Sequence, residues 1–147
     1  MTNPISLKAL VLEDSATCYE HLSLTAAGIQ DIPLMLINVK TVEEFDAALA
    51  DQPDVAFVDL VLKDSDSTAT IKKLYQWIAF APLIIVSSHY LPELVDESGR
   101  LGISYLIKGQ YGPETLAIAV RQARVAWQMR KDMAQSVHNG LKWNLTI

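Results

Sequence analysis

Acidic, hydroxyl and basic side chains follow four of the apolar segments in this sequence. Glu13 and Asp14 follow one apolar run, Asp59 follows a second, and Ser87 and Lys108 follow two more. In an open parallel α/β sheet, ligands bind beyond the carboxyl ends of the strands. If these runs are parallel strands of one sheet, the five side chains meet at one edge and form a single polar site.

The chemistry of such a site follows from its charges. Three carboxylates repel one another unless a cation or shared protons neutralise them. Mg2+ (or Mn2+) suits this role, because Mg2+ prefers oxygen ligands and bridges carboxylates to phosphate oxygens. A lysine and a hydroxyl opposite the acids indicate an anion with several oxygens, most simply a phosphoryl group. An aspartate can itself be the nucleophile that forms an acyl phosphate.

Each of these residues taken alone has a structural explanation. Asp14 suits a helix N-cap, Ser87 a turn and Lys108 a solvated loop. Tyr105, three residues before Lys108, suits the core. Their joint occurrence in strand order favours a functional site.

The elements that position the site are predicted from apolar runs and helical spacing. Five short apolar segments are typical of buried strands, at 7–12, 34–39, 55–58, 83–86 and 103–107. Helices are predicted at 15–27, 41–50, around 71–78, at 91–100 and from 113 to about 137. Parallel neighbours require helical crossovers, so the pattern predicts an α/β fold with a five-stranded, doubly wound parallel sheet and helices on both faces.

Particular residues mark the helix ends. Gly28 is expected to end the first helix in the left-handed conformation, and Thr41 with Glu44 forms a capping box at the second. The last helix carries an inner stripe of Leu116, Val120, Ala123 and Trp127.

The length of 147 residues fits one compact unit. Residues 1–128 are expected to form the domain, and 129–147 a helical extension and tail, interpreted as a candidate linker to an output domain outside this sequence. Alternating apolar residues in 141–147 give the tail a strand-like pattern. It is interpreted as an edge strand, a partner contact or the start of another domain.

Composition excludes several classes of function. The net charge is −5 and no window is rich in Lys and Arg, so direct nucleic-acid binding is not expected. The single cysteine, Cys18, excludes a disulfide framework and a cysteine-based zinc site, and is expected to be a buried thiol in a cytoplasmic protein. The longest apolar run, 78–86, contains Pro82 and is shorter than the roughly 20 residues that span a membrane.

Over residues 7–126 the sequence resembles the receiver domain of response regulators of two-component signalling, in its chemotaxis-regulator form. The matching segments are LVLEDS at 10–15, VAFVDLVL at 55–62, LIIVSS at 83–88, YLIKG at 105–109 and the amphipathic last helix. The resemblance implies the flavodoxin-like receiver fold.

The resemblance also assigns roles to the polar residues. It makes Asp59 the phosphoacceptor, and it makes Glu13, Asp14, Asp59 and the backbone carbonyl of Val61 the metal-binding set. It implies that a histidine kinase or a histidine phosphotransfer domain supplies the phosphoryl group. Catalysis would be limited to the chain's own phosphorylation and dephosphorylation.

The resemblance further implies a switch. Ser87 and Lys108 would contact the phosphoryl oxygens, and Tyr105 would rotate inward as the Ser87 hydroxyl moves. The signal would reach a downstream effector through the face formed by the helix at 91–100, the strand at 103–107 and the last helix. A homodimer through this face is a further expectation.

The sequence departs from the family pattern at several positions. Glu13 is longer than the usual aspartate, Lys63 stands where proline is frequent, and Gly109 stands where a cis-proline is common. Val61 and His89 occupy positions that tune dephosphorylation. An apolar Val61 cannot orient an attacking water, so the phosphorylated state is expected to be long-lived, and His89 would partly offset this.

Two rival functions fit part of the pattern. Residues 64–68 spell the aspartate-rich signature of haloacid-dehalogenase-type phosphatases, with Asp64 as nucleophile, but they lie mid-chain and five residues beyond a strand end. The same fold could also serve as a pseudo-receiver that only makes protein contacts.

Overall fold

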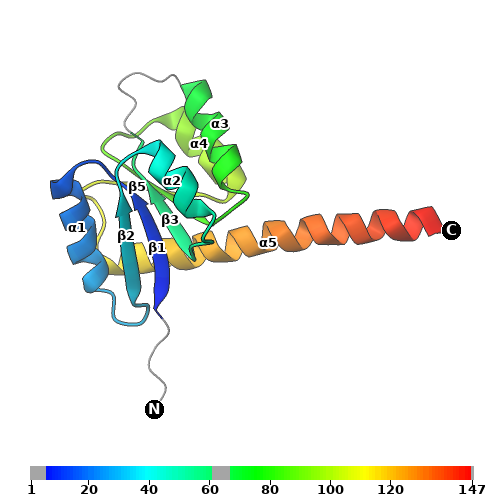
Figure 1. Cartoon of the computed structure of the whole chain (residues 1–147), viewed down its shortest axis with the longest axis horizontal. Coiled ribbons are helices and arrows are strands. Elements are labelled where there is room, and N and C mark those ends of the chain that lie inside the picture. Colours follow the sequence, from blue (N-terminus) through cyan, green and yellow to red (C-terminus); the bar gives the residue numbers. More distant parts are fainter. Residues whose placement is uncertain (1–5, 61–66, 147) are drawn as a thin grey trace, which may run out of the picture.

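The computed structural model describes residues 6–60 and 67–146, which form a parallel sheet covered by helices on both faces (Figure 1). The strand order is β2-β1-β3-β4-β5, and every neighbouring pair is parallel. The strands are β1 Leu7–Leu12, β2 Leu34–Val39, β3 Val55–Val58, β4 Leu83–Ser87 and β5 Ser104–Ile107. The predicted five-stranded, doubly wound α/β fold is confirmed.

Five helices form the two outer layers. They are α1 Ala16–Ala27, α2 Val42–Leu49, α3 Ser67–Trp77, α4 Pro92–Leu101 and α5 Pro113–Thr146. Helices α1 and α5 pack on one face of the sheet, while α2, α3 and α4 pack on the other. Each of the two layers therefore buries one side of the same strands.

Burial on both faces explains why the strands are almost uninterrupted apolar runs. In β1, Ala9 and Val11 face the layer of α1 and α5, while Leu10 and Leu12 face the opposite layer. All four residues of β3 are buried. Because the strands have no polar face, polar residues concentrate where the strands end.

The helix ends partly follow the sequence prediction. The N-cap half of the capping box of α2 is confirmed, with the Glu44 N–H donating to Thr41 Oγ1 at 3.1 Å. The Glu44 carboxylate accepts from the Thr41 hydroxyl at 3.0 Å and not from the Thr41 N–H. The left-handed ending at Gly28 is wrong, because this residue has φ −79°. Its N–H still donates to the Thr25 carbonyl at 3.1 Å, so α1 ends in an ordinary right-handed turn.

Helix α5 is longer than predicted. It continues through Gly140 to Thr146, well beyond the sheet (Figure 1). The predicted helix end near Val137 is therefore wrong, and so is the strand-like pattern of the tail over residues 141–146. A helix that has already formed gains one hydrogen bond per added residue, whereas a short alternating segment needs a neighbouring strand. Among the described residues, no helix is both long and apolar enough to cross a membrane.

The turn after α4 supplies a stability test. Gly102 has φ 73°, and a Cβ there would lie 2.8 Å from the Cβ of Ala126 in α5. We expect Gly102→Ala to lower the free energy of unfolding by about 2–3 kcal/mol, from the left-handed backbone and the overlap together. Urea unfolding measures the change.

Gly99 is the matched control, because it lies inside α4 and a Cβ there meets nothing within 4 Å. Gly99→Ala should be neutral or stabilising by up to about 1 kcal/mol, from helix propensity. Equal effects of the two substitutions would contradict the role given to the turn.

Candidate functional site

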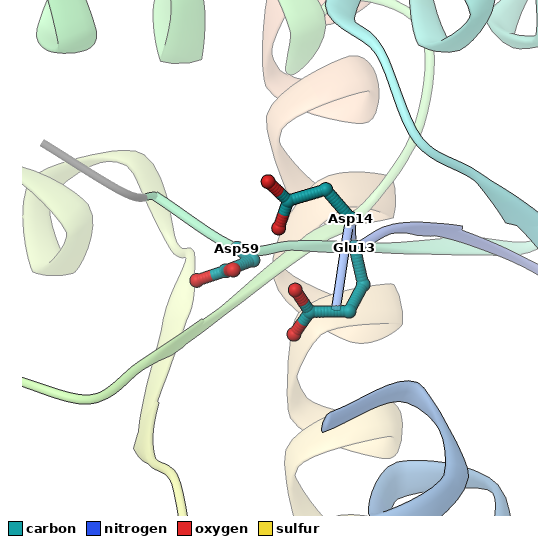
Figure 2. Close-up of side chains that lie close together, drawn as sticks. All are labelled: Glu13, Asp14 and Asp59. Atoms are coloured by element: carbon teal, nitrogen blue, oxygen red, sulfur yellow. The ribbon is translucent and has the colours of Figure 1, made fainter. Parts of the chain in front are cut away.

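Three carboxyl groups converge where β1 and β3 end. Glu13 and Asp14 follow β1 directly and Asp59 follows β3, so the parallel pairing of these strands brings them side by side. One carboxylate oxygen from each residue lies within 4.8 Å of the others. Figure 2 shows the three side chains gathered at the strand ends. The Asp59 N–H donates to the Leu12 carbonyl at 3.0 Å, which fixes this register.

Lys108 joins the end of β5 to this group. Its Nζ lies 2.8 Å from Glu13 Oε1 and 3.1 Å from Asp59 Oδ2. Both carboxylate side chains are only 6% exposed, so these ion pairs are shielded from water. The Lys108 N–H donates to the Ser87 carbonyl at 2.8 Å, which holds the lysine beside the end of β4.

Gly109, which stands where the family that the sequence resembles commonly has proline, has a distinctive backbone conformation. It has φ 78°, a left-handed conformation. Proline cannot adopt this conformation, because its ring fixes φ near −65°. The loop after Lys108 therefore has a backbone conformation that proline at position 109 could not adopt.

The close approach of these charges shifts their proton affinities. Burial and a hydrogen bond with Glu13 raise the pKa of Asp59 to about 7, although Lys108 opposes the change. Burial alone would raise the pKa of Glu13, but hydrogen bonds with Asp59 and Lys108 bring it below its usual value. Burial alone would lower the pKa of Lys108, but the two carboxylates raise it. At neutral pH Lys108 and Glu13 are therefore ionised, whereas Asp59 is protonated in a fraction of the molecules.

Ser87 and Tyr105 are both tied to the backbone of His89. The Ser87 side chain is buried, and its Oγ accepts a hydrogen bond from the His89 N–H at 3.2 Å. The Tyr105 hydroxyl donates to the His89 carbonyl at 2.7 Å. Residue 89 is itself exposed. The Ser87 and Tyr105 side chains are therefore both hydrogen-bonded to the same loop residue, His89.

A cavity of about 240 Å³ that sequence reasoning missed adjoins the acids and Lys108. Thr17, Cys18 and His21 of α1 line it together with Tyr111, whose ring packs edge-on against His21 with centroids 6.4 Å apart. Cys18 is half-buried at this wall, which corrects the expectation of a buried thiol. The only sign of this cavity wall in the sequence was the position of Thr17 and Cys18 one helical turn before His21 in α1.

The predicted site residues thus fall into two groups. Glu13, Asp14, Asp59 and Lys108 lie together, and Ser87 is joined to them through the backbone of Lys108. Val61 and Asp64 lie outside the described residues, as does Lys63, so the roles predicted for Val61 and Asp64 stay predictions.

The acidic cluster fits a divalent cation. Its three carboxylates come from two neighbouring strand ends, Glu13 and Asp14 after β1 and Asp59 after β3, and the ionised Glu13 opposes ionisation of Asp59. A hard cation with oxygen ligands, such as Mg2+, would relieve this repulsion.

Comparison of the sequence with known protein families and with curated proteins gave no match. The structure, in contrast, is similar to solved receiver domains. The signal receiver domain of a LuxO-type repressor protein from Vibrio parahaemolyticus is 16% identical with a TM-score of 0.65, over 88% of this chain and 98% of that chain. The receiver domain of a modulated diguanylate cyclase from Desulfovibrio desulfuricans G20 is 20% identical with a TM-score of 0.63, over 86% and 99%.

The Mn2+-bound form of the response regulator Rcp1 is 18% identical with a TM-score of 0.55, over 80% of this chain and 89% of that chain. These similarities establish that the chain has the fold of response-regulator receiver domains.

The raised pKa of Asp59 predicts a pH-dependent stability. The folded state holds the Asp59 proton more tightly than the unfolded state, so the wild-type protein loses stability from this group as pH rises from about 4 to about 7. Without divalent ions, Asp59→Asn should raise the free energy of unfolding by about 2–4 kcal/mol at pH 8, and by less than about 0.5 kcal/mol at pH 4.

Denaturant unfolding in the presence of a chelator measures this difference. The exposed Asp51 provides the control, because Asp51→Asn should leave the stability almost unchanged at both pH values. A constant effect of Asp59→Asn across the pH range would show that Asp59 titrates normally.

Proposed function

We propose that this chain is a phosphoryl-accepting receiver domain of two-component signalling, with Asp59 as the nucleophile. The observation that carries the proposal is the pairing of Asp59 Oδ2 with Lys108 Nζ at 3.1 Å, beside two further carboxylates at the strand ends. A structural aspartate needs only one counter-charge. Extra carboxylates opposite a lysine favour a site for a cation and a transferred anion.

Each residue of the site would have a separate role in phosphoryl transfer. An Asp59 oxygen would attack the phosphorus, so that an acyl phosphate bond forms as the bond to the donor histidine breaks. The Lys108 ammonium would interact with the phosphoryl oxygens, and its ion pair with Glu13 would keep it oriented. Glu13, Asp14 and Asp59 would hold a divalent ion, which supplies positive charge to the phosphoryl group when bound.

Signal output would use the loop shared by Ser87 and Tyr105. If the Ser87 hydroxyl turns toward the phosphoryl group, its hydrogen bond with the His89 N–H breaks, and the bond from Tyr105 to the same residue is disturbed. Such coupling commonly amounts to ~1–3 kcal/mol. The proposed downstream partner is an effector protein that contacts the face formed by α4, β5 and α5. The proposed phosphoryl donor is a histidine kinase or a phosphotransfer domain.

Phosphoryl acceptance is tested with a small phosphodonor. Incubation with phosphoramidate and Mg2+ should give an acyl phosphate resonance in phosphorus NMR and a mass increase of one phosphoryl group. Asp59→Asn should abolish both, because it removes the nucleophilic carboxylate. Asp54→Asn, next to β3 but at the opposite strand end, should retain them.

The outcomes separate the rival functions. No label on the wild-type protein would favour a pseudo-receiver. Label and phosphomonoester turnover that survive Asp59→Asn but vanish in Asp64→Asn would favour a phosphatase.

Divalent-ion binding is tested at Asp14, the exposed member of the acidic cluster. Asp14→Asn should weaken Mn2+ or Mg2+ binding by roughly tenfold or more, because a neutral amide is a poorer ligand for a hard cation than a carboxylate. Calorimetric titration measures the affinity. Glu20→Gln, which removes an exposed acid from α1, should leave it unchanged. Equal affinities of wild type and Asp14→Asn would remove Asp14 from the metal site.

A further inference from the structure

A row of large apolar side chains lies on the solvent side of α5. Its members are Ile118, Val125, Met129, Met133 and Val137, each between 55% and 65% exposed. At 3.6 residues per turn they share one face of the helix, opposite the buried Leu116, Val120 and Ala123. The row covers roughly 28 Å at a rise of 1.5 Å per residue.

This row has no cover from the rest of the described chain. Residues 128–139 are all exposed, and the helix projects beyond the sheet (Figure 1). Helices in proteins obtain most of their stability from packing an apolar face. Scattered surface apolar residues are normal, but a continuous row marks an interaction site.

The spacing does not suit a long coiled coil in either orientation, so the charges, not the spacing, decide how two copies pair. Continuing the step of seven residues from Ile118 to Val125 leads to Asp132, so the heptad repeat is interrupted. A parallel pair would also place like charges beside each other, with Arg130 facing its own copy.

The charge distribution favours an antiparallel pair. Residues 121–147 contain five Lys and Arg side chains and one acidic side chain, whereas residues 1–120 contain seven basic and sixteen acidic ones. In a parallel pair the two basic extensions would lie together. In an antiparallel pair, the basic extension of one copy runs toward the acidic domain of the other.

Two flanking residues give the register. Arg121 and Asp132 lie on the same side of the apolar row, at opposite ends of its central part, and both are exposed. Within one copy Arg121 pairs with Asp31 at 2.6 Å and Asp132 accepts a hydrogen bond from Gln128 at 3.0 Å; both contacts are at the surface, so a contact between copies can replace them. In an antiparallel pair centred midway between them, Arg121 of each copy lies beside the partner's Asp132. The same two-fold symmetry repeats this contact and overlaps both apolar rows.

We propose that the outward face of α5, from Ile118 to Val137, is the interface with a second copy of this chain in an antiparallel, two-fold-symmetric dimer. The interface uses α5 alone, and differs in this from a dimer built on α4, β5 and α5 together. It is independent of phosphoryl acceptance at Asp59.

Analytical ultracentrifugation of the full chain, from micromolar to submillimolar concentration, tests the dimer. The wild type should sediment as a dimer, and Met133→Glu should weaken association by at least tenfold. Leu24→Glu makes the same chemical change on α1, at a residue that is 67% exposed, and should leave the dimer intact. Circular dichroism checks that each variant is folded. A monomeric wild type, or a dimer unaffected by Met133→Glu, would overturn the proposal.

The orientation is tested with spin labels at Asn139→Cys in a Cys18→Ser background. The antiparallel register places the two labelled positions roughly 35–40 Å apart, from the rise per residue, whereas a parallel pair places them close together. Arg121→Asp and Asp132→Arg should each weaken the dimer, and the double variant should restore it. A short label distance, or binding only to vesicles of phosphatidylglycerol and phosphatidylcholine without self-association, would overturn the proposal.

Discussion

The ammonium group of Lys108 is shared by two carboxylates from different strands, and the candidate site depends on this contact. Glu13 stands at the end of β1 and Asp59 at the end of β3, while the lysine follows β5. The ammonium reaches both acids only if the strands are in register and end at the same level. Pairing of β1 with β3 and of β4 with β5 therefore determines the geometry of the charges.

The two buried carboxylates, placed side by side, make the site costly for the fold even though Lys108 pairs with both. Asp59 is held in a shielded position beside another acid, and this raises its pKa to about 7. Apolar packing on both faces of the sheet, from residues such as Phe45 and Phe57, offsets the cost of assembling charges at its edge. A strongly shifted pKa of this kind is typical of functional sites. An aspartate with a purely structural role would gain no stability from a second carboxylate beside it.

The sequence predicts the sheet and the acid-lysine site well, because strands buried on both faces appear as apolar runs and their ends as abrupt polar residues. It fails where the local sequence allows two conformations, and where only a tertiary contact brings a residue to the site. The left-handed backbone predicted for Gly28 was wrong, since a glycine after a helix can adopt either sign of φ. The predicted end of α5 was also wrong, since an alternating tail can form a helix or a strand. The cavity wall at Tyr111 was missed, because only the packing of the loop against α1 brings it to the site.

The most direct test of Asp59 as phosphoryl acceptor is chemical trapping of the phosphorylated residue. After treatment with phosphoramidate and Mg2+, borohydride reduces an aspartyl phosphate to homoserine, which mass spectrometry of peptides can locate. Homoserine at position 59 is the predicted result. Homoserine at position 64, or at no aspartate in a protein that still binds Mg2+, would contradict the assignment of Asp59 as the nucleophile.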